Sequence, residues 1–277
     1  MKLLGIIAIS LTAALLQIHL LQMACGNLPN NMGLWITQQG WPGYRSRILG
    51  LWLIKLFGGD VRAFMDVTVG SLTIAGLLAW RLGGAGGLGI LHACFAVFAS
   101  PWFAPWDMLE PAIFLVFVVL VVEDWHPLWL MGLFAVAIFN LQSAMFIAGW
   151  MVLAGVWRSG LLCIAFGLAV MYWFQHTQGI GYGTFQCLDG HTTGISTDYA
   201  QERLVENLHK LFLWDNRMPL GIFVILGWAA LKITRALPAL GLTFLALLGA
   251  TLVFGIVDEL RCFLPLIPVL ILAVKEN

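Results

Sequence analysis

Charged side chains are scarce in this sequence. They make up 10% of its 277 residues and sum to a net charge of zero, whereas a soluble domain carries about 25%. The zero net charge gives no support to nucleic-acid binding, which needs a basic face. Hydrophobic residues make up 61% of the chain, and its mean hydropathy is +0.92. A soluble fold of this length cannot bury that much apolar surface, so the composition predicts a protein dissolved in lipid.

Several sequence patterns are also missing. The apolar runs are continuous, without the alternating strands of about 10 residues that build a transmembrane β-barrel. The five cysteines form no Cys-x-x-Cys pair, and no His-Glu-x-x-His motif occurs. These absences remove the usual spacings of a zinc or redox centre. We therefore expect no cofactor, although the acidic residues described below could hold a divalent metal.

Long apolar runs predict an all-α, polytopic transmembrane bundle of about ten spans, within a range of eight to eleven. The runs are 3–23, 64–80, 86–100, 111–122, 127–140, 142–157, 159–174, 218–234, 238–256 and 262–274. Several are shorter than the ~17 residues of a full crossing. The region 111–157 is compatible with three short helices, two long ones or partial helices. The glycines within 83–87 predict a tight cytoplasmic turn and a close helix contact. The first run is longer than a signal-peptide core, so we expect it to be retained.

Positive charge predicts the orientation. With Lys2 in the cytoplasm and ten crossings, Arg81, Arg158, Lys232, Arg235 and Lys275 fall on the same side. The prediction is a multi-pass protein of the bacterial inner membrane with both termini in the cytoplasm. The excess of positive charge on the cytoplasmic side is incomplete, because the segments 24–62 and 175–217 carry seven cations on the outer side.

The chain 1–277 is expected to form a single transmembrane domain with two polar outer segments, 24–62 and 175–217. Within the first, 46–57 is typical of a helix lying at the membrane interface. The second half of the other segment, from about Asp198, predicts an amphipathic helix. Its expected apolar face consists of Leu204, Leu208, Leu211 and Phe212.

Three charges stand at the start of the last apolar run, "DELRCFLPLIPVL". Glu259 and Arg261 are too close in sequence to face each other on a helix. One interpretation is a solvated helix start, with Pro265 early in the helix and Pro268 distorting it. The other is an outward cavity in which Arg261 binds an anion such as a lipid phosphate and Glu259 orients it.

A second acidic pair lies in "SPWFAPWDMLEPAIF", where Asp107 and Glu110 have a spacing of i, i+3. They could supply a general base or a metal ligand, or form a polar connector with a capping acid. In "FNLQSAMFIAGW", Asn140, Gln142 and Ser143 interrupt an apolar run. Such side chains either hold helices together or line a substrate path.

Four segments together resemble the GT-C glycosyltransferase superfamily of bacterial polytopic proteins. They are "GYRSRILGLWLIKLF", "PWDMLEPAIFLVFVVLVV", "FNLQSAMFIAGW" and "DELRCFLPLIPVL". This chain departs from the pattern at Leu141 and Gln142, which stand where the family has Arg-Glu. It also lacks any acid from 24 to 59, so that Asp60 is the first candidate in the outer loop that commonly carries the family's base.

The resemblance implies sugar transfer from a polyprenyl-phosphate-linked sugar to an acceptor at the outer leaflet. It implies a carboxylate base, here Asp60, Asp107 or Glu110, and lipid-phosphate contacts from Arg45 or Arg261 with Glu259 beside them. The competing hypothesis is a non-catalytic structural or accessory subunit of a larger membrane complex. Convergence of the charged residues on one outward site would favour the enzyme, and their dispersal would favour the subunit.

Overall fold

The computed structural model describes residues 2–24, 48–98, 107–140, 142–178, 197–212, 218–254 and 260–275. Every regular element in these ranges is a helix, which confirms the all-α prediction. The helices are α1 (Lys2–Ala24), α3 (Ile48–Leu56), α4 (Val61–Phe98), α5 (Glu110–Val122), α6 (Pro127–Ala137), η2 (Gln142–Ala144), α7 (Met145–Leu153), α8 (Trp157–Gln178), α9 (Thr197–Phe212), α10 (Met218–Ala236), α11 (Pro238–Phe254), η3 (Leu260–Leu266) and α12 (Ile267–Lys275).

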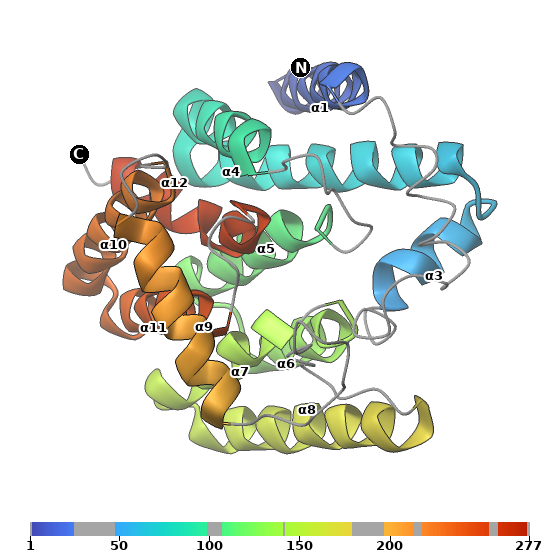
Figure 1. The fold of residues 1–277 in the computed structure, drawn as a ribbon. Helices are drawn as coiled ribbons and strands as arrows, with labels where there is room; N and C mark the ends of the chain where they lie inside the picture. The colour runs from blue at the N-terminus through green and yellow to red at the C-terminus, as the bar shows by residue number, and fades with distance from the viewer. Residues whose placement is uncertain are drawn as a thin grey trace.

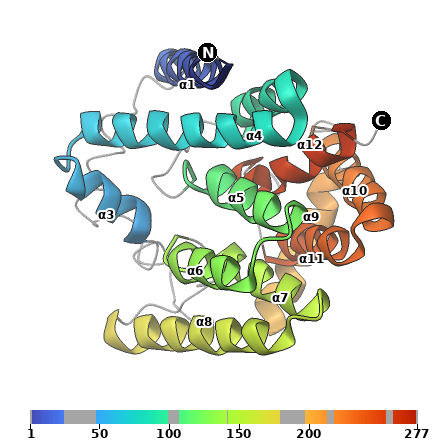
Figure 2. The ribbon, with the colours of Figure 1, turned by 180° about the vertical axis from the view of Figure 1, so that it is seen from behind.

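The helices form layers around α4. Figure 1 shows α4 across the bundle, with α1 above it and α8 at the opposite edge. Helices α5, α6 and α7 lie between α4 and α8, as the view from behind also shows (Figure 2). Helix α4 contacts α1, α5 and α12, while α10 packs on both α11 and α12. The interior is filled by phenylalanines such as Phe64, Phe114, Phe134 and Phe263, which bring together residues from both halves of the chain.

A glycine bend divides α4. Gly84 has φ 61° and ψ −147°, a conformation that residues with a Cβ rarely adopt. Beyond the bend the chain returns so closely that a Cβ on Gly87 would lie 2.2 Å from the carbonyl oxygen of Ala79. The expected tight turn in the glycine-rich stretch 83–87 is therefore confirmed. Without it, the 38 residues of α4 would extend about 57 Å, nearly twice the thickness of a bilayer core.

The prolines near the C-terminus mark a change of helix type. Residues Leu260–Leu266 form a 3₁₀ helix that contains Pro265, and α12 begins at Ile267. Pro268 occupies the first turn of α12, where its missing N–H would have no acceptor within the helix. The helix distortion predicted at Pro268 is thus a junction between the 3₁₀ helix η3 and α12. All seven side chains from Phe263 to Val269 are buried, so this junction belongs to the core.

Within the described residues, three helices are long and apolar enough to cross a membrane: α1, α4 and α10. Shorter apolar stretches lie in α5, α6, residues 157–173 of α8 and α11. In the region with three alternatives, the chain forms three short helices, α5, α6 and α7. The predicted membrane character is supported by these three long helices, whereas the count of ten spans stays a prediction.

The two polar outer segments contain the helices expected there. Helix α3 covers most of the predicted 46–57, and its backbone is tied to the bundle because Leu49 N–H donates to Phe139 O at 3.0 Å. Helix α9 begins at Thr197, as the amphipathic pattern predicted. The predicted apolar face is only partly buried, because Leu211 is buried whereas Leu208 and Phe212 are exposed. Polar side chains of α9 take part of the inward face.

Candidate functional site

Two buried carboxylates mark the start of α5. Asp107 lies in the turn 107–109, and Glu110 is the first residue of the helix. Their residues are only 4% and 2% exposed. The residue that caps α5 is Leu109, which makes no side-chain capping bond. Both acids are therefore buried, and the interpretation as a polar connector with a capping acid stays a hypothesis.

Arg261 reaches Asp107 across the fold. One guanidinium nitrogen, Nη1, lies 3.3 Å from Asp107 Oδ2, although the two residues are 154 positions apart. The side chains are 13% and 5% exposed, so this ion pair is largely shielded from solvent. An isolated charge in such surroundings would be strongly unfavourable, and pairing offsets much of that penalty. The solvated helix start considered for Arg261 is excluded by this burial.

Glu110 binds the segment that follows α6. The Ser143 hydroxyl in η2 donates to Glu110 Oε1 at 2.7 Å. Asn140, in the turn before η2, is buried as well. The predicted role of these polar residues in holding helices together is thus confirmed for Ser143. The side chain of Gln142 lies outside the described part of the structure.

Two hydroxyls on α4 hold the turn between the acids. Ser71 Oγ donates to Met108 O at 2.6 Å, and Thr68 Oγ1 lies 2.9 Å from Met108 Sδ and 2.8 Å from Phe64 O. Both hydroxyls are buried. They fix the backbone from which Asp107 and Glu110 project. Neither hydroxyl was predicted to belong to the site, although two hydroxyls spaced i, i+3 on an apolar helix are a usable signal in the sequence.

The remaining predicted residues divide into two groups. Asp60 is exposed and caps α4, because its Oδ1 accepts from the Ala63 N–H at 2.7 Å. It precedes Thr68 by about 12 Å along the helix axis, and none of its described contacts joins it to Asp107 or Glu110. Arg45 and Glu259 lie outside the described residues, so their predicted contact with a lipid phosphate stays a prediction.

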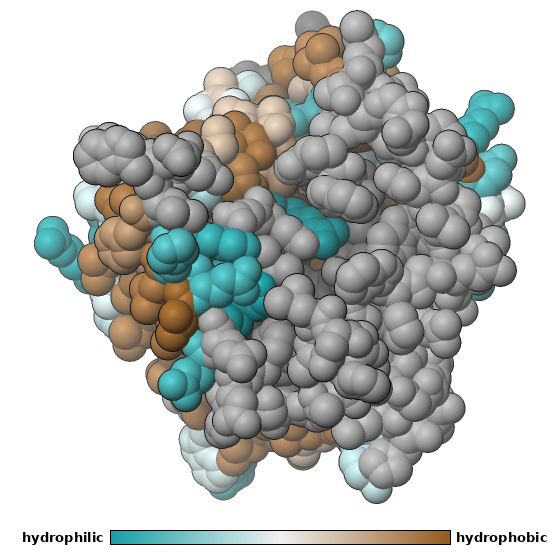
Figure 3. Space-filling model, in the orientation of Figure 1, coloured by the Kyte–Doolittle hydropathy of each residue, from teal (hydrophilic) through white to brown (hydrophobic). Residues whose placement is uncertain are grey.

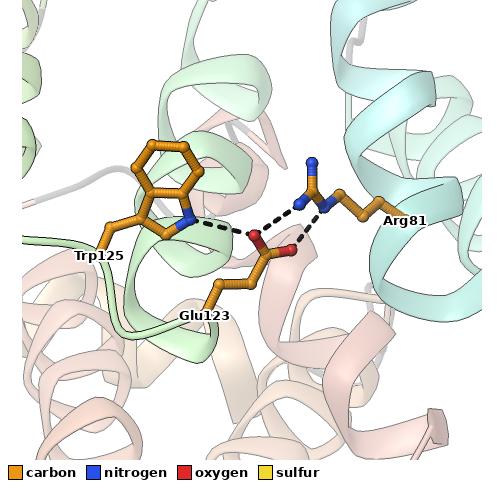
Figure 4. A network of polar contacts seen from close by, with 3 residues as sticks. All are labelled: Arg81, Glu123 and Trp125. Carbon is orange, nitrogen blue, oxygen red and sulfur yellow. Dashed lines mark hydrogen bonds and ion pairs between the residues drawn. The ribbon is translucent and has the colours of Figure 1, made fainter.

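A second polar network lies at the other end of α5 (Figure 4). Arg81 Nε and Nη2 donate to the two oxygens of Glu123 at 2.5 and 2.6 Å, and Trp125 Nε1 donates to the same carboxylate at 3.0 Å. The hydrogen bond from Trp125, together with the charge of Arg81 and of Lys275, lowers the pKa of Glu123 below its ordinary value. Arg81 is more than half exposed, so this network is open to water where the Asp107 pair is not.

The length of α5 separates the two networks. Its 13 residues correspond to about 20 Å along the helix axis. One end therefore carries an exposed Arg–Glu–Trp cluster, and the other carries the buried group of Asp107, Glu110, Arg261 and Ser143. We refer to this buried group as the α5 N-terminal cluster. A bilayer core is about 30 Å thick. If the exposed end of this 20 Å helix lies at one membrane surface, the cluster at its other end lies inside the bilayer core, short of the opposite surface.

The α5 N-terminal cluster can act on an anion and on a hydroxyl. Arg261 offers a planar fork of donors that suits phosphate oxygens. Glu110 presents an oxygen that already accepts a hydrogen bond from a hydroxyl group. Within the described ranges, no group of three or more His, Cys, Asp or Glu side chains is arranged to hold a metal ion. Comparison of this chain with protein-family models, curated proteins and solved structures finds no match.

Proposed function

We propose that the protein is an integral membrane glycosyltransferase-like enzyme that takes a sugar from a polyprenyl-phosphate donor at the outer leaflet. The observation that carries the proposal is the buried ion pair of Asp107 with Arg261, three residues before the buried carboxylate of Glu110. Ionisable groups inside an apolar bundle are unfavourable and usually serve a function. The pair of Asp107 and Arg261 is one part of the convergence on an outward site that the enzyme hypothesis requires.

The proposed topology has about ten crossings in a GT-C-like bundle, with both termini in the cytoplasm. Contacts among the predicted cytoplasmic cations support this orientation. Arg81 binds Glu123, whose carboxylate also lies in the field of Lys275. Lys232 Nζ donates to Ala273 O at 2.6 Å, two residues before Lys275. Three of the six cations assigned to the cytoplasm thus gather at one end, away from the α5 N-terminal cluster.

In the proposed reaction, Glu110 acts as the general base. Its Oε1 accepts a hydrogen bond from Ser143 at 2.7 Å, the contact that an acceptor hydroxyl would make if it displaced Ser143. Glu110 removes the hydroxyl proton while the hydroxyl oxygen bonds to the anomeric carbon of the donor sugar. The bond from that carbon to the phosphate oxygen breaks, and the polyprenyl phosphate leaves with the electron pair.

Arg261 would bind the departing phosphate, and Asp107 would orient Arg261. The Nη1–Oδ2 distance of 3.3 Å is longer than the 2.7–2.9 Å typical of a charge-assisted bond. A guanidinium carries five N–H donors, so Arg261 can exchange one contact with Asp107 for phosphate oxygens. Asp60 is the weaker candidate for the base, because its carboxylate already caps α4.

The test is transfer by purified protein in proteoliposomes. Radiolabelled polyprenyl-phosphate glucose, mannose and arabinose are supplied one at a time, and release of polyprenyl phosphate is measured. Glu110→Gln should abolish release while retaining donor binding in native mass spectrometry, and Arg261→Gln should weaken binding. Arg81→Gln, which removes the same charge at the other end of α5, is the matched control and should leave both unchanged.

The burial of Asp107 and Glu110 favours a second candidate, a non-catalytic subunit of a larger membrane complex. A catalytic base must reach its substrate, and residues 4% and 2% exposed need a conformational opening to do so. In that case the cluster joins η3 and η2 to α5 and does no chemistry. Equal donor binding by the wild-type protein, Arg261→Gln and Arg81→Gln, without sugar release, would select this candidate.

A further inference from the structure

Helix α9 exposes three apolar side chains and buries two polar ones, although its Leu211 is buried as well. Val205, Leu208 and Phe212 are 61%, 39% and 72% exposed. Arg203 and Asn207, on the opposite side of the helix, are 6% and 0% exposed. A helix at a protein–water boundary has the reverse arrangement, with its apolar stripe turned toward the core. The surroundings of α9 are therefore more apolar than water.

The buried polar side chains of α9 are held by the protein. Asn207 Nδ2 donates to Leu252 O at 2.7 Å, near the end of α11, where helix carbonyls lack partners in their own helix. Arg203 pairs with Glu206 at 2.5 Å, and Glu206 also pairs with Lys210 at 2.9 Å. These contacts fix the rotation of the helix, because turning α9 by half a turn would break the bond to α11.

We propose that α9 lies in the surface of the lipid bilayer, with Val205, Leu208 and Phe212 among the acyl chains. Such a face, with charged side chains along its flank, is typical of interfacial helices. Glu206 and Lys210 form that flank and are partly exposed. In Figure 3, hydrophilic and hydrophobic surfaces adjoin where α9 crosses the front of the molecule in Figure 1.

Lipid is the favoured occupant because the exposed face continues onto a candidate membrane span. Helix α9 contacts α10, which is long and apolar enough to cross a bilayer. The surface of α10 exposes Val224, Ile225 and Leu231, each by more than half. Lipid that surrounds α10 can therefore extend over α9. The proposal is independent of sugar transfer, because it concerns only how α9 meets the membrane.

The experiment uses the wild-type protein in vesicles of phosphatidylcholine and phosphatidylglycerol. A phosphatidylcholine with a diazirine at the end of one acyl chain is activated by light, and labelled tryptic peptides are mapped by mass spectrometry. Cleavage after Arg203 and Lys210 releases the peptide 204–210, which contains Val205 and Leu208. The peptide 63–81, with the exposed Ile74 of the span α4, is the positive control.

We expect lipid label on Val205 and Leu208 in preference to Glu206 and Asn207, at a yield similar to that of 63–81. A water-soluble diazirine should leave Val205 and Leu208 unlabelled. Labelling of Val205 and Leu208 by the water-soluble probe alone would overturn the proposal, because it places that face in water. Protection from both probes, at every ratio of protein to lipid, would also overturn it, because a second protein surface would then cover α9.

Discussion

The pair of Asp107 and Arg261 allows a double-mutant cycle with a strong expected signal. At the 3.3 Å separation, two unit charges attract by ~5 kcal/mol when the effective dielectric constant is about 20. Replacing one partner, as in Asp107→Leu or Arg261→Met, leaves the other charge buried without this counter-ion. Such changes typically lower the free energy of unfolding by about 3–5 kcal/mol. For a chain of this size that is a fall of about 10 °C in melting temperature.

The double variant Asp107→Leu with Arg261→Met should be much more stable than either single variant. It removes both charges, and apolar side chains of similar volume often replace a buried ion pair with little loss, here about 1 kcal/mol. The assay is the melting temperature in detergent, followed by intrinsic tryptophan fluorescence. Additive effects of the two substitutions would refute the reasoning, since additivity means that the two charges do not interact.

The pair of Arg81 and Glu123 supplies the matched control cycle. It also joins an arginine to a carboxylate, at the other end of α5, but the Arg81 side chain is 57% exposed. We expect a small coupling that weakens with added salt, because water and ions screen exposed charges. A coupling as large as that of the buried pair would show that solvent exposure does not decide the difference.

Three further changes test other parts of the fold. Ser143→Ala should lower the free energy of unfolding by about 1–3 kcal/mol, because it leaves Glu110 with one buried bond fewer; its melting temperature measures this. Gly87→Ala should cost about 1–3 kcal/mol of folding free energy through overpacking, because the new Cβ would lie 2.2 Å from Ala79 O. The pKa of Glu123 is lowered in the folded protein, so its carboxylate stabilises the fold. The melting temperature of the wild type should exceed that of Glu123→Gln by the full amount at pH values above the ordinary pKa of a glutamate. This difference should vanish as the pH falls through the lowered pKa.

Matched variants decide whether these effects have the stated causes. Thr73→Ala removes a hydroxyl that donates to Val69 O in its own helix, and it should cost less than Ser143→Ala. Gly89 has open space around it, so Gly89→Ala should be nearly neutral, and equal losses at both glycines would contradict the steric explanation. A melting difference for Glu123→Gln that grows toward low pH would contradict the sign of the pKa shift.

The helices were predictable from the sequence because long apolar runs leave few alternatives in lipid. The glycines around Gly84 predicted the bend of α4, since a close return of the chain excludes a Cβ at Gly87. The number of helices between 111 and 157 was not predictable, because runs this short fit several arrangements. The described residues there contain α5, α6 and α7, with turns at 123–124 and 138–140 and the 3₁₀ helix η2.

The candidate site was predictable only in part. The spacing of Asp107 and Glu110 predicted a shared face, but Asp107 precedes the helix and turns to Arg261 while Glu110 turns to Ser143. Local spacing cannot supply either partner, because Arg261 lies 154 positions away. The rotation of α9 was not predictable for a similar reason, because it depends on the bond from Asn207 to α11.

The double variant also separates a structural role from a functional one. If the pair of Asp107 and Arg261 only joins η3 to α5, apolar replacement of both residues restores the fold and leaves every other property intact. If Arg261 binds a lipid phosphate, the same variant recovers its melting temperature but still fails to bind a polyprenyl-phosphate sugar. Stability and binding then respond differently to one pair of substitutions. A stable variant that binds the donor like the wild-type protein would exclude Arg261 from the site.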